Sequence, residues 1–96
     1  MTGTTRSSHG LDDRRKRLLY RCWHRGTREM DLILGRFADA HVASLDDAGL
    51  DALERLIAAS DPALYAALTG AMEPAPDFAG AMFERVKAFQ ISDWQA

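Results

Sequence analysis

Cysteine is almost absent from this chain of 96 residues, in which Cys22 is the single example. An internal disulfide is therefore impossible, and the sequence has neither a Cys-x-x-Cys pair nor a Cys/His set with zinc-ligand spacing. No hydrophobic run approaches the roughly 20 residues that cross a bilayer, and residues 1–10 contain no apolar segment of the kind found in secretory signals. These absences predict a cytoplasmic protein of a reducing compartment, without membrane insertion.

A strong excess of one charge is also lacking, because the formal net charge is −2. This value excludes a uniformly basic protein that coats nucleic acid. The charges are nevertheless unevenly distributed, since the segment from Arg14 to Arg36 holds eight Lys or Arg against two Asp or Glu. Such a cationic patch on an acidic body indicates a defined partner or an anionic ligand.

Sustained alternation of apolar and polar residues, the mark of strands, is missing as well. Apolar residues instead recur at three- and four-residue spacing, which predicts helices over 12–25, 27–41, 45–59, 62–69 and 78–90. We therefore expect an all-α fold, a compact antiparallel bundle of five short helices. A single domain over 12–91 would lie between an N-terminal tail, 1–11, and a C-terminal tail, 92–96.

Local signals define the expected helix ends. Gly26 tolerates a left-handed conformation and ends the first helix. The other signals mark helix starts: the acidic first-turn residues Asp12 and Asp13, a capping box from Ser44 to Asp47, an N-cap at Asp61 before Pro62, and an N-cap at Asp77. The residues expected to face the core are Leu18, Leu19, Cys22, Trp23, Met30, Ile33, Leu34, Phe37, His41, Leu50, Leu53, Leu56, Ile57, Leu64, Tyr65, Leu68, Phe78, Met82, Val86 and Phe89.

Arginines recur at helical spacing in the first third of the chain, at Arg14, Arg17, Arg21, Arg25 and Arg28. On one continuous helix they would form a narrow stripe. A solvated helix face explains such a stripe, and so does a recognition surface, because arginine presents a planar fork suited to carboxylates, phosphates and protein interfaces. Nucleic acid is an alternative target, although a sequence pI of about 5.8 disfavours it.

The segment Arg25-Gly26-Thr27-Arg28-Glu29 lies at the expected junction of the first two helices. In the simplest interpretation, Gly26 ends one helix, and Thr27 and Glu29 open the next. That interpretation leaves the clustered charges unexplained. A junction between packed helices presents its side chains rigidly, which favours recognition of a partner.

Catalytic arrangements find little support in the sequence. The histidines His9, His24 and His41 are scattered, and Cys22 and His24 are two positions apart, so on a helix they point in different directions. There is no glycine-rich phosphate loop and no His-Glu-x-x-His pair. We therefore expect no catalytic residues and no metal site.

The motif at the junction resembles a known pattern. Arg17-Leu18-Leu19-Tyr20 followed by Arg25-Gly26-Thr27-Arg28-Glu29 is similar to the RLLY…RGxxE pattern of the SdhE-type FAD assembly factors, the bacterial counterparts of mitochondrial succinate dehydrogenase assembly factor 2. The likeness spans about 14–90 and continues through Leu32-Ile33-Leu34, Phe37, Asp61-Pro62, Tyr65 and Pro74-Ala75-Pro76-Asp77-Phe78. Some bacterial members have a proline before the aromatic pair of the second helix, where this chain has Gly35-Arg36-Phe37.

The resemblance implies a helical factor that binds the flavoprotein subunit of succinate dehydrogenase and promotes covalent attachment of FAD to a histidine of that subunit. The flavoprotein of fumarate reductase is a further candidate partner. The factor itself would be a monomer or weak dimer when free, would hold no cofactor stably and would have no enzymatic activity. The residues expected to bind the partner are Arg17, Arg21, Arg25, Gly26, Arg28, Glu29, Asp61 and Tyr65. The competing hypothesis is a nucleic-acid-binding or antitoxin-like regulator that uses the Arg14–Arg28 stripe.

Overall fold

Five α-helices make up the protein, which a computed structural model describes over residues 10–95, with side chains through Phe89. The elements in chain order are α1 (Asp13–Trp23), α2 (Arg28–His41), the short 3-10 helix η1 (Val42–Ser44), α3 (Asp47–Ile57), α4 (Asp61–Leu68) and α5 (Ala81–Gln95). No strand occurs in residues 10–95, so the predicted all-α fold with five helices is confirmed. None of these helices is both long and apolar enough to cross a membrane.

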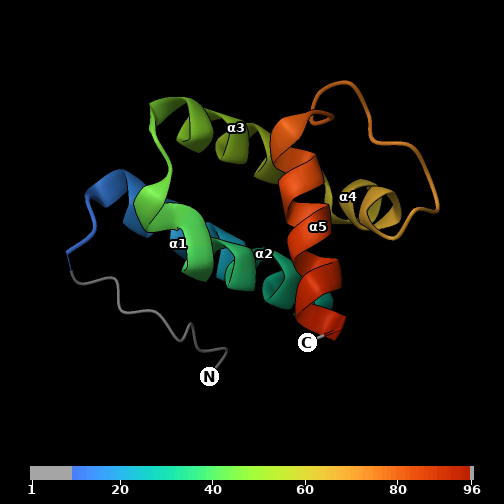
Figure 1. Cartoon of the computed structure of the whole chain (residues 1–96), viewed down its shortest axis with the longest axis horizontal. Helices are drawn as coiled ribbons and strands as arrows, with labels where there is room; N and C mark the ends of the chain where they lie inside the picture. Colours follow the sequence, from blue (N-terminus) through green and yellow to red (C-terminus); the bar gives the residue numbers. More distant parts are fainter. Residues whose placement is uncertain (1–9, 96) are drawn as a thin grey trace.

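The helices pack around one shared core. α1 and α2 lie against each other, and α5 lies across α2 and α3 (Figure 1), while α4 lies at the end of the molecule away from the start of α1. The core contains nearly all the residues that the periodicity predicted, together with Phe83, which the prediction omitted. Tyr65 is the clear exception: it was expected to face inward but is 41% exposed, because Leu64, Ala67 and Leu68 provide the inner face of α4.

The junction of α1 and α2 differs from the prediction at both of its ends, mainly at the end of α1. α1 stops at Trp23, before the expected end at 25, and Gly26 adopts a φ of 110° within the connection rather than directly after the helix. α2 begins at Arg28, one residue after the expected start at Thr27, because Thr27 is its N-cap and the Thr27 hydroxyl accepts the N–H of Met30 at 3.3 Å.

The predicted caps of α3 and α4 are wrong by one residue or more. Ser44 belongs to η1 and donates to the carbonyl of His41, so the N-cap of α3 is Asp46, which accepts the N–H of Gly49 at 2.8 Å. In α4 the N-cap is Ser60, and Asp61 is the first helical residue. The carboxylate of Asp61 has a tertiary partner instead, described below.

α5 also begins later and ends later than predicted. The chain from Pro74 forms turns, in which the N–H of Phe78 donates to the carbonyl of Ala75, so Asp77 does not cap a helix. The helix starts at Ala81 and continues to Gln95, beyond the expected end at 90 and into the predicted C-terminal tail. Of the predicted N-terminal tail, residues 1–9 lie outside the described chain, and Leu11 packs against the core.

Candidate functional site

The arginines of the predicted stripe divide into different roles. Arg14 donates to Asp51 at 2.5 Å and to Glu54 at 2.9–3.0 Å, and so ties α1 to α3. The Arg14 guanidinium holds the pKa of the Glu54 carboxyl below its ordinary value. Arg14 is therefore engaged in an intramolecular ion pair. The five arginines do not form one continuous stripe, because α1 ends before Arg25 and Arg28.

Arg25 is held within the protein. Its Nε and Nη2 donate to Oδ1 of Asp61 at 2.9 and 2.8 Å, Nη1 donates to the carbonyl of Ile57 at 2.6 Å, and Nη2 donates to the carbonyl of Ala59 at 2.9 Å. The side chains of Arg25 and Asp61 are 12% and 19% exposed. Two residues that were both predicted to bind a partner are therefore paired with each other.

The backbone beside Arg25 is fixed as well. The N–H of Arg25 donates to Oδ1 of Asp31, in the first turn of α2, at 2.5 Å. Gly26 follows with a positive φ, and Thr27 caps α2. The connection is thus anchored on both sides of Gly26, as expected for a rigid corner.

The residues that follow Arg25 face solvent. We call Gly26, Thr27, Arg28 and Glu29 the corner; all four are exposed. Their exposure is what the hypothesis of a recognition motif requires, because a buried corner could not reach a partner. No hydrogen bond or ion pair joins the Arg28 or Glu29 side chain to another side chain of the described residues.

The outer side of α1 adds further exposed groups beside the corner. Arg17 and Arg21 are exposed and form no ion pair with the described residues. Tyr20 is 64% exposed, and its ring stacks on that of His24 with centroids 3.8 Å apart. The spacing places Arg17, Tyr20 and Arg21 on one side of α1, and His24, which follows the last residue of α1, joins them through the stacked rings. The residues predicted from the sequence to bind a partner did not include Tyr20 or His24. The available signal was an aromatic residue placed among arginines at helical spacing.

This arrangement suits binding and offers no catalytic pair. Burial raises the pKa of the Cys22 thiol to about 12, so the thiolate needed for nucleophilic attack is scarce near neutral pH. The Nδ1–H of His24 donates to the carbonyl of Tyr20 at 2.7 Å. The described residues contain no group of His, Cys, Asp and Glu that could hold a metal ion. The exposed cations instead form a positively charged surface.

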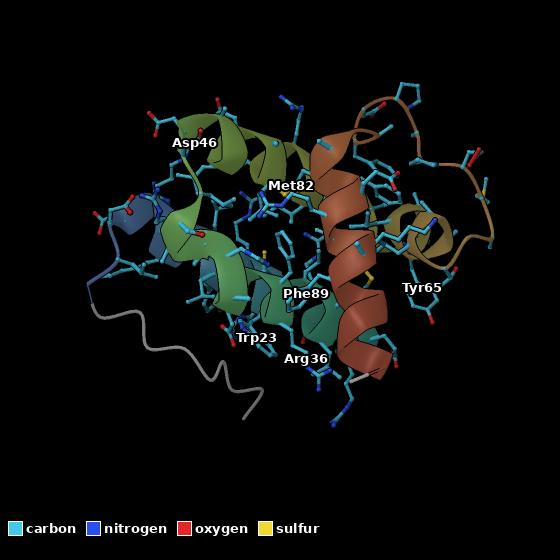
Figure 2. The ribbon with its side chains drawn as sticks, viewed as in Figure 1. Trp23, Arg36, Asp46, Tyr65, Met82 and Phe89 are labelled. Atoms are coloured by element: carbon cyan, nitrogen blue, oxygen red, sulfur yellow. The ribbon has the colours of Figure 1, made fainter. Side chains whose placement is uncertain are left out.

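The position of the α1 to α2 connection is supported by a contact behind it. Trp23, the last residue of α1, packs on Gly35 of α2, and its Nε1–H donates to Asp39 at 3.0 Å. Figure 2 shows Met82 and Phe89 extending from α5 toward the interior, while Tyr65 lies at the periphery beside α4. The indole thus fixes the end of α1 against the middle of α2.

Comparison with known proteins agrees with the resemblance found in the sequence. Residues 16–90 match a protein family described as the flavinator of succinate dehydrogenase. The FAD assembly factor SdhE of Legionella pneumophila (strain Paris) is 42% identical over 65 residues, which cover 67% of this chain and 81% of that protein. That of Acetobacter pasteurianus (strain NBRC 105184 / IFO 3283-01) is 36% identical over 67 residues, or 70% of this chain and 61% of that protein.

A mitochondrial protein is also similar to this chain. Succinate dehydrogenase assembly factor 2 of Meyerozyma guilliermondii is 39% identical over 64 residues, which cover 67% of this chain and 44% of that protein. No solved structure gives a significant match. The family match, 16–90, spans the corner, the whole of α2, α3 and α4, and most of α1 and α5. The chain therefore belongs to the Sdh5/SdhE family of FAD assembly factors, the flavinators of succinate dehydrogenase.

Proposed function

We propose that this protein docks on the flavoprotein subunit of succinate dehydrogenase and promotes covalent attachment of FAD to that subunit. The observation that carries the proposal is the corner, which is exposed, charged and held rigidly by the bonds of Arg25, Asp31 and Thr27. Membership of the flavinator family indicates which reaction the protein assists. The corner offers a surface through which one protein can act on another.

Positioning is the contribution that this chain can make. The flavin and the residue that it joins belong to the partner and supply the chemistry of the bond. Holding reacting groups in the right geometry accelerates a reaction without any catalytic side chain. A corner already fixed in the free protein serves this purpose, because little ordering entropy is lost when it binds.

Within this surface we assign different tasks to the exposed charges. Arg28 and Glu29 are adjacent and of opposite sign, so they favour a partner surface with a complementary arrangement of charges. Arg17 and Arg21, on the outer side of α1, increase the rate of encounter with an acidic partner. The same charged surface could bind the flavoprotein of fumarate reductase as a second partner. With either partner, the FAD is held by the partner.

Deleting the gene is expected to remove most of the covalently bound flavin from the succinate dehydrogenase flavoprotein subunit. The measurement is acid-stable flavin fluorescence of that subunit in denaturing gels, with the wild-type gene restored as the control. Undiminished covalent flavin in the deletion strain would contradict the proposed function.

A gel-shift titration at two salt concentrations tests the nucleic-acid hypothesis, which predicts binding that weakens steeply with salt.

Gly26→Ala is expected to lower the free energy of unfolding by about 1 kcal/mol, because an alanine is strained at a φ of 110°. It should also reduce covalent flavin, since relief of this strain displaces the corner. Gly70→Ala is the matched control, as Gly70 has a φ of 84° after α4, distant in sequence from the corner. Urea unfolding should show similar losses for both variants. Equal covalent flavin in the two would indicate that the corner geometry is unimportant.

A further inference from the structure

Arg25 connects the start of α2 with the end of α3 and the start of α4, which are more distant in the sequence. Its backbone N–H bonds to Asp31 in α2, and the acceptors of its guanidinium lie at the last residue of α3, in the short connection after it and at the first residue of α4. Those acceptors are the carbonyls of Ile57 and Ala59 and the carboxylate of Asp61. One side chain therefore attaches the start of α4 to the corner.

The acceptors are of a kind that needs such a donor. Ile57 is the last residue of α3, and the final carbonyls of a helix have no partner within it. A cation at this end is also stabilised by the helix dipole. Asp61 is the first residue of α4, so its carboxylate lies where a negative charge is favoured. The planar fork of arginine reaches all three acceptors at once, which the single ammonium of lysine cannot do in the same geometry.

Tyr65 lies one helical turn after Asp61. Residues four apart share a side of a helix, so Tyr65 is on the side of α4 that carries the bonded carboxylate. Its side chain is nevertheless 41% exposed, while Leu64 and Leu68 are buried. Leu64 and Leu68 hold the inner face of α4 on the core, and the Arg25–Asp61 ion pair joins the side of α4 that carries Tyr65 to the corner.

We propose that Arg25 and Asp61 form a clasp that positions Tyr65 relative to the corner, so that the flavoprotein subunit contacts both the corner and Tyr65. In this assignment Arg25 and Asp61 are positioning residues, and neither touches the partner. The inference rests on the proposed function and refines it. It gives the two arginines of the Arg25-Gly26-Thr27-Arg28-Glu29 segment different roles, because Arg25 is internal and Arg28 is exposed.

The two clasp residues carry opposite charges, and this separates positioning from direct contact. If the Arg25 guanidinium attracted an acidic partner directly, its loss would weaken binding, and loss of the nearby Asp61 carboxylate would leave binding unchanged or strengthen it. Positioning predicts that both losses weaken binding, because each releases α4 from the corner.

The experiment measures the dissociation constant between the purified flavoprotein subunit and the full-length protein by titration calorimetry at two salt concentrations. Arg25→Met is expected to weaken binding about tenfold and Asp61→Ala several-fold, since each removes charge-assisted hydrogen bonds. Arg25→Lys should recover part of the loss by keeping the ion pair. Neither Arg25→Met nor Asp61→Ala should change the salt dependence, whereas the exposed control Arg28→Met should reduce it.

A double-mutant cycle gives the second readout. Tyr65→Ala and Arg25→Met should lose less affinity together than the sum of the single losses, because the clasp acts through Tyr65. Circular dichroism checks that each variant is folded, and Asp61→Ala carries the test if Arg25→Met unfolds. Additive losses, or tighter binding by Asp61→Ala, would overturn the clasp. A wild-type protein that does not bind the subunit would instead refute the proposed function itself.

Discussion

Gly35→Ala is expected to lower the free energy of unfolding by about 2–3 kcal/mol, although alanine is the better helix former by about 1 kcal/mol. A Cβ at position 35 would overlap the six-membered ring of Trp23. The indole cannot move aside cheaply, because Trp23 is 6% exposed and its Nε1–H is bonded to Asp39 at 3.0 Å. Steric overlap therefore outweighs helix propensity at this position.

The control for this prediction is Gly49→Ala in α3. Its Cβ would meet Cδ2 of Leu45 at 3.1 Å and both Cβ of Leu45 and Oδ1 of Asp46 at 3.2 Å, contacts that shifts of a few tenths of an ångström relieve, so the gain in helix propensity should nearly offset the crowding. Urea unfolding followed by circular dichroism measures both variants. Gly49→Ala should change stability by less than about 1 kcal/mol. A Gly35→Ala variant as stable as wild type would mean that Trp23 does not lie on Gly35.

Glu29→Ala is expected to reduce covalent flavin on the succinate dehydrogenase flavoprotein about tenfold or more while the protein remains folded. Glu29 is exposed in the first turn of α2 and makes no ion pair with the described residues, so the fold loses little when it is removed. Loss of a charged contact at the centre of a protein interface, by contrast, commonly costs about 2 kcal/mol or more. The effect should therefore fall on function.

Glu84→Ala is the matched control, because Glu84 is also an exposed glutamate in the first turn of a helix, α5. Each substitution removes a favourable interaction with a helix dipole, worth about 0.3–1 kcal/mol. Thermal unfolding should therefore give similar small shifts for the two variants. Acid-stable flavin fluorescence should fall for Glu29→Ala alone. If Glu29→Ala is folded and supports normal flavin attachment, the motif at the corner has been assigned wrongly.

The core was largely predictable because burial follows a period that can be read along the chain. Leu18, Leu34, Leu53 and Val86 are buried where helical spacing placed them. Tyr65 was predicted inward and is exposed, since periodicity does not distinguish adjacent positions in a helix of eight residues. Helix ends were less predictable, as at Asp61, whose carboxylate bonds to a residue 36 positions away instead of capping α4.

The sequence by itself determined the helical class, most of the core and the location of the charged segment that we propose as the recognition motif, because these depend on spacing and on residue types close together in the chain. The tertiary structure alone decided which arginines are available. Arg25 and Arg28 are three positions apart and chemically identical, yet Arg25 meets acceptors between α3 and α4 and Arg28 faces solvent. Such a difference arises from contacts between distant segments, which local periodicity does not encode.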